Sequence, residues 1–346
     1  MKKSYFIFFL FFTTATFAQS GDYDVFLARQ FFENGEYAKA SEYYNDLFQQ
    51  NPAEYYADYL NVLILLKDFD KAEKTIKTIY KQSGNNPLYL MDLADLYLKQ
   101  NKEEEANKQF NKTIKELKPD RYTISQIAEK FIQLKQLDFA QRAYEKGKEI
   151  LKDKNAFNLN IAKLLYLKND WNGMINAYLN EAPFQANDLT PIENGLQAVL
   201  TEEKLKDALE KELLKRVQAT KSEYAYQDLL VWLYMQRNDF DGAILQAKSL
   251  DMMRREDGEN VLRISRTAAI QKDYDAAAKG YQYIIDKGPQ FSSYVTANLE
   301  LINVKRDKIV NSPNYTREQL LSLKKTYQDF IKNFNNEYTV TTATLE

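Results

Sequence analysis

The sequence has 346 residues, of which 47 are basic and 49 acidic, and it contains neither cysteine nor histidine. The absence of cysteine excludes disulfides and thiolate sites, and the absence of histidine removes the commonest general base and metal ligand. We therefore expect no catalytic residue, no cofactor and no metal site. Because the charges almost cancel, nothing favours a nucleic-acid partner.

The first 18 residues have the pattern of a bacterial secretory signal peptide. Lys2 and Lys3 precede an apolar run from Tyr5 to Phe12, and Thr16-Phe17-Ala18 places small residues three and one before a cleavage point. The run is shorter than the roughly 20 apolar residues that span a membrane. We expect residues 1–18 to be removed, leaving an exported chain that begins at Gln19, has no membrane span and resides in the periplasm or is secreted.

Residues 21–290 repeat one pattern, in a chain whose few glycines and prolines favour helices. Each copy begins with an apolar residue and a small residue, followed by an aromatic. A second small residue lies twelve positions after the first small residue, and a second aromatic follows it. The first copy reads Leu27-Ala28, Phe31, Ala40 and Tyr44. The residue at this later position, which is alanine in every copy but one, is in order Ala40, Ala72, Ala106, Ala140, Met174, Ala208, Ala243 and Ala277.

This pattern resembles the tetratricopeptide repeat, which has a period of about 34 residues. The resemblance implies an all-α, right-handed superhelical solenoid of antiparallel helix pairs, with about eight pairs in one array over residues 21–290. Small residues such as Ala28 and Ala40 would lie where the two helices of a pair cross. Links such as Asn34-Gly35-Glu36-Tyr37 and Lys272-Asp273-Tyr274 would turn the chain, and their Asp or Asn would cap the second helix.

The C-terminal part departs from this period. Residues 291–336 predict a longer helix pair, with one helix from Phe291 to about Lys308 and a second to about Phe334. Thr316 and Gln319 match a capping box at the start of the second helix. Residues 337–346 are either a tail or the start of a truncated further repeat, and an apolar open end there could support self-association.

The resemblance also implies that the first helix of each pair lines a concave groove. One groove position is mixed in charge and a neighbouring one is mostly apolar, which predicts a protein-binding trough. An alternative is that neighbouring helices fill the apolar row and that Trp232 is a core residue. The candidate protein-binding residues are Arg29, Phe32, Asn61, Ile64, Leu98, Ile132, Lys163, Tyr166, Trp232, Met235 and Arg266.

The sequence contains no phosphate-binding loop, no dinucleotide glycine cluster and, without histidine, no helical zinc-protease motif. It therefore predicts a non-catalytic scaffold or adaptor outside the cytoplasm, which binds a peptide or helix of an unidentified protein, for example one of the cell envelope. The alternative is the repeat arm of an exported enzyme or of a larger envelope complex. Its catalytic part would then lie beyond Glu346 or on a partner chain.

Overall fold

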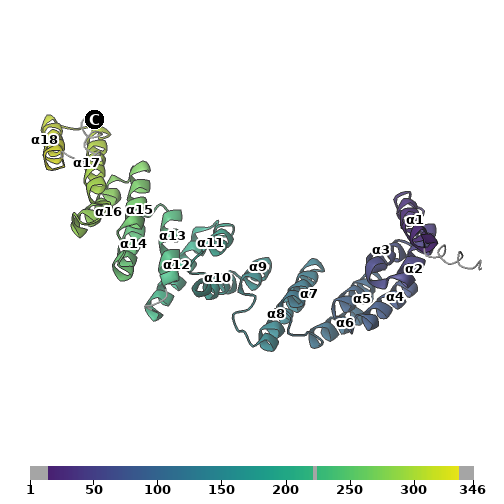
Figure 1. Ribbon diagram of the computed structural model, residues 1–346. Coiled ribbons are helices and arrows are strands. Elements are labelled where there is room, and N and C mark those ends of the chain that lie inside the picture. The colour runs from purple at the N-terminus through teal and green to yellow at the C-terminus, as the bar shows by residue number, and fades with distance from the viewer. Residues whose placement is uncertain (1–14, 221–223, 335–346) are drawn as a thin grey trace, which may run out of the picture. The chain divides into compact units, whose positions relative to one another are not determined.

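The computed structural model describes residues 15–220 and 224–334, and these form eighteen α-helices and one 3-10 helix (Figure 1). Contacts divide the chain after Phe157 into two compact units, where the sequence predicts a single array. The first unit contains α1 (Ala15–Glu33), α2 (Tyr37–Gln50), α3 (Pro52–Leu65), α4 (Phe69–Gln82), α5 (Leu88–Lys99), α6 (Glu103–Lys115), α7 (Arg121–Gln133) and α8 (Leu137–Leu151).

The second unit begins at Asn158. It contains α9 (Asn158–Leu167), α10 (Trp171–Glu181), η1 (Ala182–Phe184), α11 (Thr190–Gln197), α12 (Glu203–Ala219), α13 (Tyr224–Gln236), α14 (Phe240–Arg254), α15 (Glu259–Ile270), α16 (Tyr274–Lys287), α17 (Tyr294–Val310) and α18 (Arg317–Asn333).

Consecutive helices pack as pairs, as the repeat predicts. In the first unit the pairs are α1 with α2, α3 with α4, α5 with α6, and α7 with α8. In the second unit α9 packs with α10, α13 with α14, and α15 with α16, while α17 packs closely on α16 and also contacts α18. Within the described residues the fold is thus an all-α solenoid of the tetratricopeptide-repeat kind, built from stacked helix pairs.

The turn inside a pair has the same backbone form in seven of these pairs. The first helix ends at a residue with positive φ, and the next backbone N–H donates to the carbonyl oxygen five residues earlier, at 2.8–2.9 Å. This is a Schellman closure, which satisfies carbonyl groups left free at the end of a helix. The positive-φ residues are Gly35, Lys67, Asn101, Lys135, Asn169, Asn238 and Lys272.

An aspartate caps the second helix in four of the pairs, as predicted from the links. The side chains of Asp68, Asp170, Asp239 and Asp273 each accept a hydrogen bond from the backbone N–H three residues on. Glu36, at the equivalent place before α2, makes no such bond. Its longer side chain reaches the Lys39 ammonium instead, at 2.5 Å, so the first pair lacks this cap.

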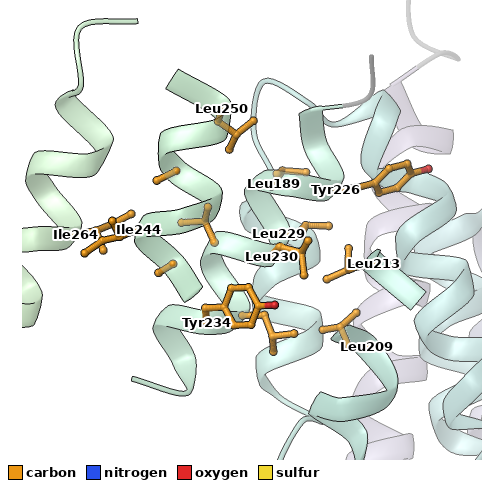
Figure 2. Close-up of a cluster of buried hydrophobic side chains, with 14 of the residues drawn as sticks. Leu189, Leu209, Leu213, Tyr226, Leu229, Leu230, Tyr234, Ile244, Leu250 and Ile264 are labelled. Atoms are coloured by element: carbon orange, nitrogen blue, oxygen red, sulfur yellow. The ribbon is translucent and has the colours of Figure 1, made fainter. Parts of the chain in front are cut away.

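The small residues of the repeat lie at the helix crossings with no exposed surface. This holds for Ala28, Ala40, Ala72, Ala106, Ala140, Ala243 and Ala277. Around the crossings of the second unit, leucine, isoleucine and tyrosine side chains form one continuous core from Ala162 to Val304. Figure 2 shows part of it, with Leu209, Leu213 and Leu230 between α12 and α13.

The sixth copy is a correction to the predicted register. Ala208 is only partly buried, whereas Leu205, Leu209 and Leu213 carry the packing face of α12. The fourth residue of α12, which corresponds to Ala243 of α14, is the charged Lys206. Without a small residue at that position no close crossing forms, and α12 packs mainly on α13 while the short α11 contacts α10.

The C-terminal helix pair agrees with the sequence. Thr316 and Gln319 form both hydrogen bonds of the capping box, and α18 packs on α17 through Leu323 and Phe330. Residues 337–346 lie outside the described residues. So do the first 14 residues of the expected signal peptide, while Ala15 to Ala18 belong to α1. Over the described residues, no helix is both long and apolar enough to cross a bilayer.

Candidate functional site

The polar row of candidate residues lies on the first helix of successive pairs and is mostly open to solvent. Arg29, Asn61, Lys163 and Arg266 are exposed. On α5, Asp95 holds the same repeat position as Asn61, and it is bound by Lys99, with 2.6 Å between the ammonium nitrogen and the carboxylate oxygen. The row therefore offers charges of both signs, some of them already paired within the chain.

Arg266 is the most engaged member of the polar row. Its guanidinium donates to both carboxylate oxygens of Glu300 on α17, at distances from 2.5 to 3.1 Å. Burial, followed by the nearby Glu300 carboxylate, raises the pKa of Tyr281 on α16. Arg266 therefore ties α15 to α17, and its positive charge is largely neutralised before any partner arrives.

The apolar row lies three residues further along each first helix. Phe32, Ile64, Leu98, Ile132 and Met235 are half-buried, and Tyr166 is exposed. In two pairs the row residue contacts the first aromatic of the second helix. These ring contacts are Phe32 with Tyr37 at 5.6 Å and Tyr166 with Trp171 at 5.7 Å between centroids. The row thus stabilises the turn and keeps one edge in solvent.

Trp232 combines packing against the core with partial exposure to solvent. It belongs to the polar row by position, yet its indole packs against the core of the second unit and is half-buried. Met235, one turn further on, packs against the same core. Both residues therefore contribute to packing, and each also presents a partly open surface.

Sequence reasoning missed three exposed apolar residues at the C-terminal ends of first helices. Leu65 and Leu167 directly follow Ile64 and Tyr166 of the apolar row, and Ile270, at the same repeat position of α15, is 76% exposed. Leu66 continues the surface beyond α3. Reading one more position of the repeat would have found them, although polar residues at that position in α1, α5 and α7 obscure the pattern.

A polar contact links three first helices in the first unit. The Tyr56 hydroxyl of α3 donates to a carboxylate oxygen of Asp92 on α5 at 2.8 Å, and the Lys130 ammonium of α7 lies 3.7 Å from the other oxygen. Burial raises the pKa of Asp92 above its ordinary value. The contact therefore joins neighbouring helix pairs of the first unit.

Two shallow depressions lie on the described surface. One, of about 560 Å³, lies between the loop before α11 and the start of α13, where Arg254 is already paired with both carboxylate oxygens of Asp228. Another, of about 700 Å³, lies over Lys148 to Asn155. No group of three or more acidic side chains that could hold a metal ion occurs among the described residues.

No protein-family model matches the chain, and no curated protein sequence matches it. Among solved structures, it is similar to a tetratricopeptide repeat protein from Parabacteroides merdae, with 13% identity, a TM-score of 0.31, and coverage of 82% of this chain and 98% of that one. The C-terminal part of a TPR repeat-containing protein from Cytophaga hutchinsonii gives 14% identity, a TM-score of 0.29, and coverage of 78% and 98%. At these scores the assignment of fold depends on the helix pairs and their repeated turns.

Proposed function

We propose that the chain is a non-catalytic scaffold that binds a helix or extended peptide of another protein along its first helices. The observation that carries this proposal is the recurrence of open apolar side chains at one end of the first helices. Leu65 of α3, Leu167 of α9 and Ile270 of α15 share one repeat position and stay exposed. Open apolar residues at a repeated position are a typical feature of a contact surface.

The neighbouring rows support the same proposal. In the second unit, the exposed Tyr166 adjoins Leu167, and Trp232 and Met235 are half-buried. The exposed Lys163 and Arg266 of the polar row add charged groups to these first helices. Aromatic side chains supply most of the binding energy in many interfaces, and surrounding polar groups select the partner. A helix or strand of a partner would place its apolar side on these residues.

We propose further that the chain is exported, on the strength of Lys2, Lys3, the apolar run and Thr16-Phe17-Ala18. The mass of the N-terminal peptide in the exported protein tests this. A chain that begins at Gln19 supports export with cleavage, whereas an exported chain that keeps Met1 to Ala18 contradicts the cleavage.

The binding proposal is tested by capture from an envelope extract, with two matched double variants beside the wild-type chain. Tyr166→Ser with Leu167→Ser removes open apolar surface from a first helix. Leu245→Ser with Met252→Ser removes comparable exposed surface from the second helix α14. We expect a partner that the first variant loses and the control retains.

The opposite pattern, with loss only in the α14 variant, would place the binding surface on the second helices. Recovery of the same enzyme in every wild-type capture would favour the alternative, in which this chain is the repeat arm of an exported enzyme complex. Circular dichroism on each variant confirms that the substituted, exposed positions leave the fold intact.

A further inference from the structure

The outer face of α1 is open and aromatic. Tyr23 and Phe26 are 61% and 58% exposed, and Glu33, also exposed, shares their face because it follows Phe26 by two helical turns. Terminal repeats of a solenoid normally carry a polar outer face that keeps them soluble. The α1 helix does not, so its outer face has the character of a surface that another helix covers.

Comparison with the other first helices of this unit shows what covers such a face. Leu27 is half-buried in α1, whereas its equivalents on the following first helices are buried, and these are Tyr59, Leu93 and Ile127. In α3 and α5 the cover is the second helix of the preceding pair, since α2 packs on α3 and α4 on α5. The second helix of a pair is therefore the kind of element that fits the outer face of α1.

Phe26 differs in chemistry from its equivalents on the following first helices. The three following pairs carry Asp58, Asp92 and Gln126 at its repeat position. Phe26 is 58% exposed at this position, so its ring is largely open among the described residues. An open aromatic side chain at a position that is polar in the following pairs is typical of a contact surface.

The helix α18 presents a matching surface in the second unit. It is the second helix of its pair, and one of its faces packs on α17 through Leu323 and Phe330. Its remaining surface is exposed and includes Leu320 and Leu321, the latter 56% exposed. Beside these leucines lie the exposed ammonium groups of Lys324 and Lys325.

The charges of the two helices are complementary. Over its length α1 carries Asp22, Asp24 and Glu33 against the single cation Arg29. Over its length α18 carries Arg317, Lys324, Lys325 and Lys332 against Glu318 and Asp329. One helix is therefore net acidic and the other net basic, and opposite charges steer two surfaces together and favour the unlike pairing over α1 with α1 or α18 with α18.

From these observations we infer that α18 of one copy of the chain packs on the outer face of α1 of a second copy. Leu320 and Leu321 would contact Tyr23 and Phe26, in the manner of a second helix on the next first helix. The contact is head to tail, so it continues into longer assemblies unless it closes into a ring. It pairs the two end helices of the described chain and does not depend on the proposed function.

Sedimentation of the full chain, whose monomer is 40.5 kDa, tests this inference with two blocked variants. Tyr23→Asp with Phe26→Asp blocks α1, and Leu320→Asp with Leu321→Asp blocks α18. We expect the wild type to form dimers or longer species and each blocked variant to be monomeric. An equal mixture of the two variants should form a dimer and nothing larger, because each supplies the face that the other retains.

Two exposed positions elsewhere serve as matched controls. Tyr122→Asp on α7 and Leu245→Asp on α14 place a charge on equally open apolar residues and should leave association unchanged. Circular dichroism verifies the fold of all variants. Increasing salt should weaken the wild-type association, because it screens charges at the surface.

Several results would overturn the inference. A wild-type chain that stays monomeric at its highest soluble concentration would overturn it directly. Association that survives blocking of either helix, or a mixture that stays monomeric, shows that the two faces do not pair. The experiment is repeated with a chain that lacks Met1 to Ala18. If association is lost with this segment, its apolar run causes the association, and the contact between α1 and α18 does not.

Discussion

At the scale of the residue, Ala106 tests the predicted crossing of α5 and α6. Its side chain has no exposed surface, so Ala106→Phe forces the two helix axes apart and should cost about 1–3 kcal/mol of unfolding free energy. Lys108→Ala, two residues away at an exposed position, should stay within about 0.5 kcal/mol of the wild type. Urea titration of both variants measures the difference, and equal effects would contradict the repeat register.

Trp232 tests how far the polar row serves packing. A fully buried tryptophan loses about 3–5 kcal/mol on truncation to alanine, so the half-buried Trp232 should lose about 2 kcal/mol. Tyr166→Ala, at an exposed position of the same surface, should lose less than about 1 kcal/mol. Thermal and urea unfolding compare the two. A Trp232→Ala effect as small as that of Tyr166→Ala would assign Trp232 wholly to the open surface.

The residue-scale features differ in how well the sequence predicts them. Ala28 and Ala106 are predictable because a helix crossing needs a small side chain at a fixed place in the period. The pairing of Arg266 with Glu300 is not, because Glu300 lies on α17, beyond the part of the chain in which the repeat is recognisable. Ile270 was missed because exposure depends on what packs nearby, and periodicity alone does not report that.

At the scale of the element, Asp251 connects three helices of the second unit. This buried carboxylate on α14 accepts from the Gly258 backbone N–H before α15, at 2.6 Å, and from the Tyr283 hydroxyl on α16, at 2.6 Å, and it pairs with Lys287. Asp251→Ala leaves the poorly exposed Lys287 ammonium without its partner. We expect a loss of about 3–5 kcal/mol in unfolding free energy.

The matched control for Asp251 lies on the same two helices. Asp241 of α14 pairs with Lys279 of α16 at 2.7 Å, but both side chains are more than half exposed. Asp241→Ala should therefore cost about 0–1 kcal/mol, because water already screens the pair. Urea unfolding of the two variants should differ by a wide margin, and similar costs would mean that burial of Asp251 adds nothing.

The turn inside each pair gives an element-scale prediction of the opposite sign. Lys272 has a φ of 66°, a conformation that costs a residue with a Cβ about 1–2 kcal/mol. Lys272→Gly removes this strain, and after the greater flexibility of glycine in the unfolded chain is subtracted it should stabilise by about 0.5–1 kcal/mol. Asn238→Gly should gain less, because asparagine tolerates this conformation. Melting temperatures of the two variants show which substitution stabilises more. A lower melting temperature for Lys272→Gly than for the wild type would contradict the prediction.

Helix ends and helix pairs were largely predictable from the sequence. The sixth copy of the repeat shows that residue spacing alone does not identify a packing face. The Asp273 and Thr316 caps could be identified because capping depends on a few adjacent residues. In α12 the alanine at the expected spacing, Ala208, turned out to be a coincidence. Its true packing face is Leu205, Leu209 and Leu213, and only the three-dimensional partner α13 reveals it.

At the scale of the whole molecule, the division after Phe157 has no counterpart in the repeat spacing. Ala140 and Met174, on either side of it, are 34 residues apart, as Ala106 and Ala140 are. The markers report the crossing inside each pair, so an unchanged period says nothing about where one compact unit ends. Link length does not mark it either, because residues 152–157 between α8 and α9 are as many as residues 288–293 between α16 and α17.

This division predicts that residues 158–346 fold without the first unit. Their core, from Ala162 to Val304, is built entirely from their own helices, and in a repeat protein stability comes from neighbouring pairs. The isolated segment should therefore show a helical circular dichroism spectrum and a cooperative urea transition. A segment that starts at Asn169 lacks α9, which uncovers the apolar face of α10 and should lower the transition midpoint. If residues 158–346 were unfolded alone while the full chain is helical, the second unit would depend on the first.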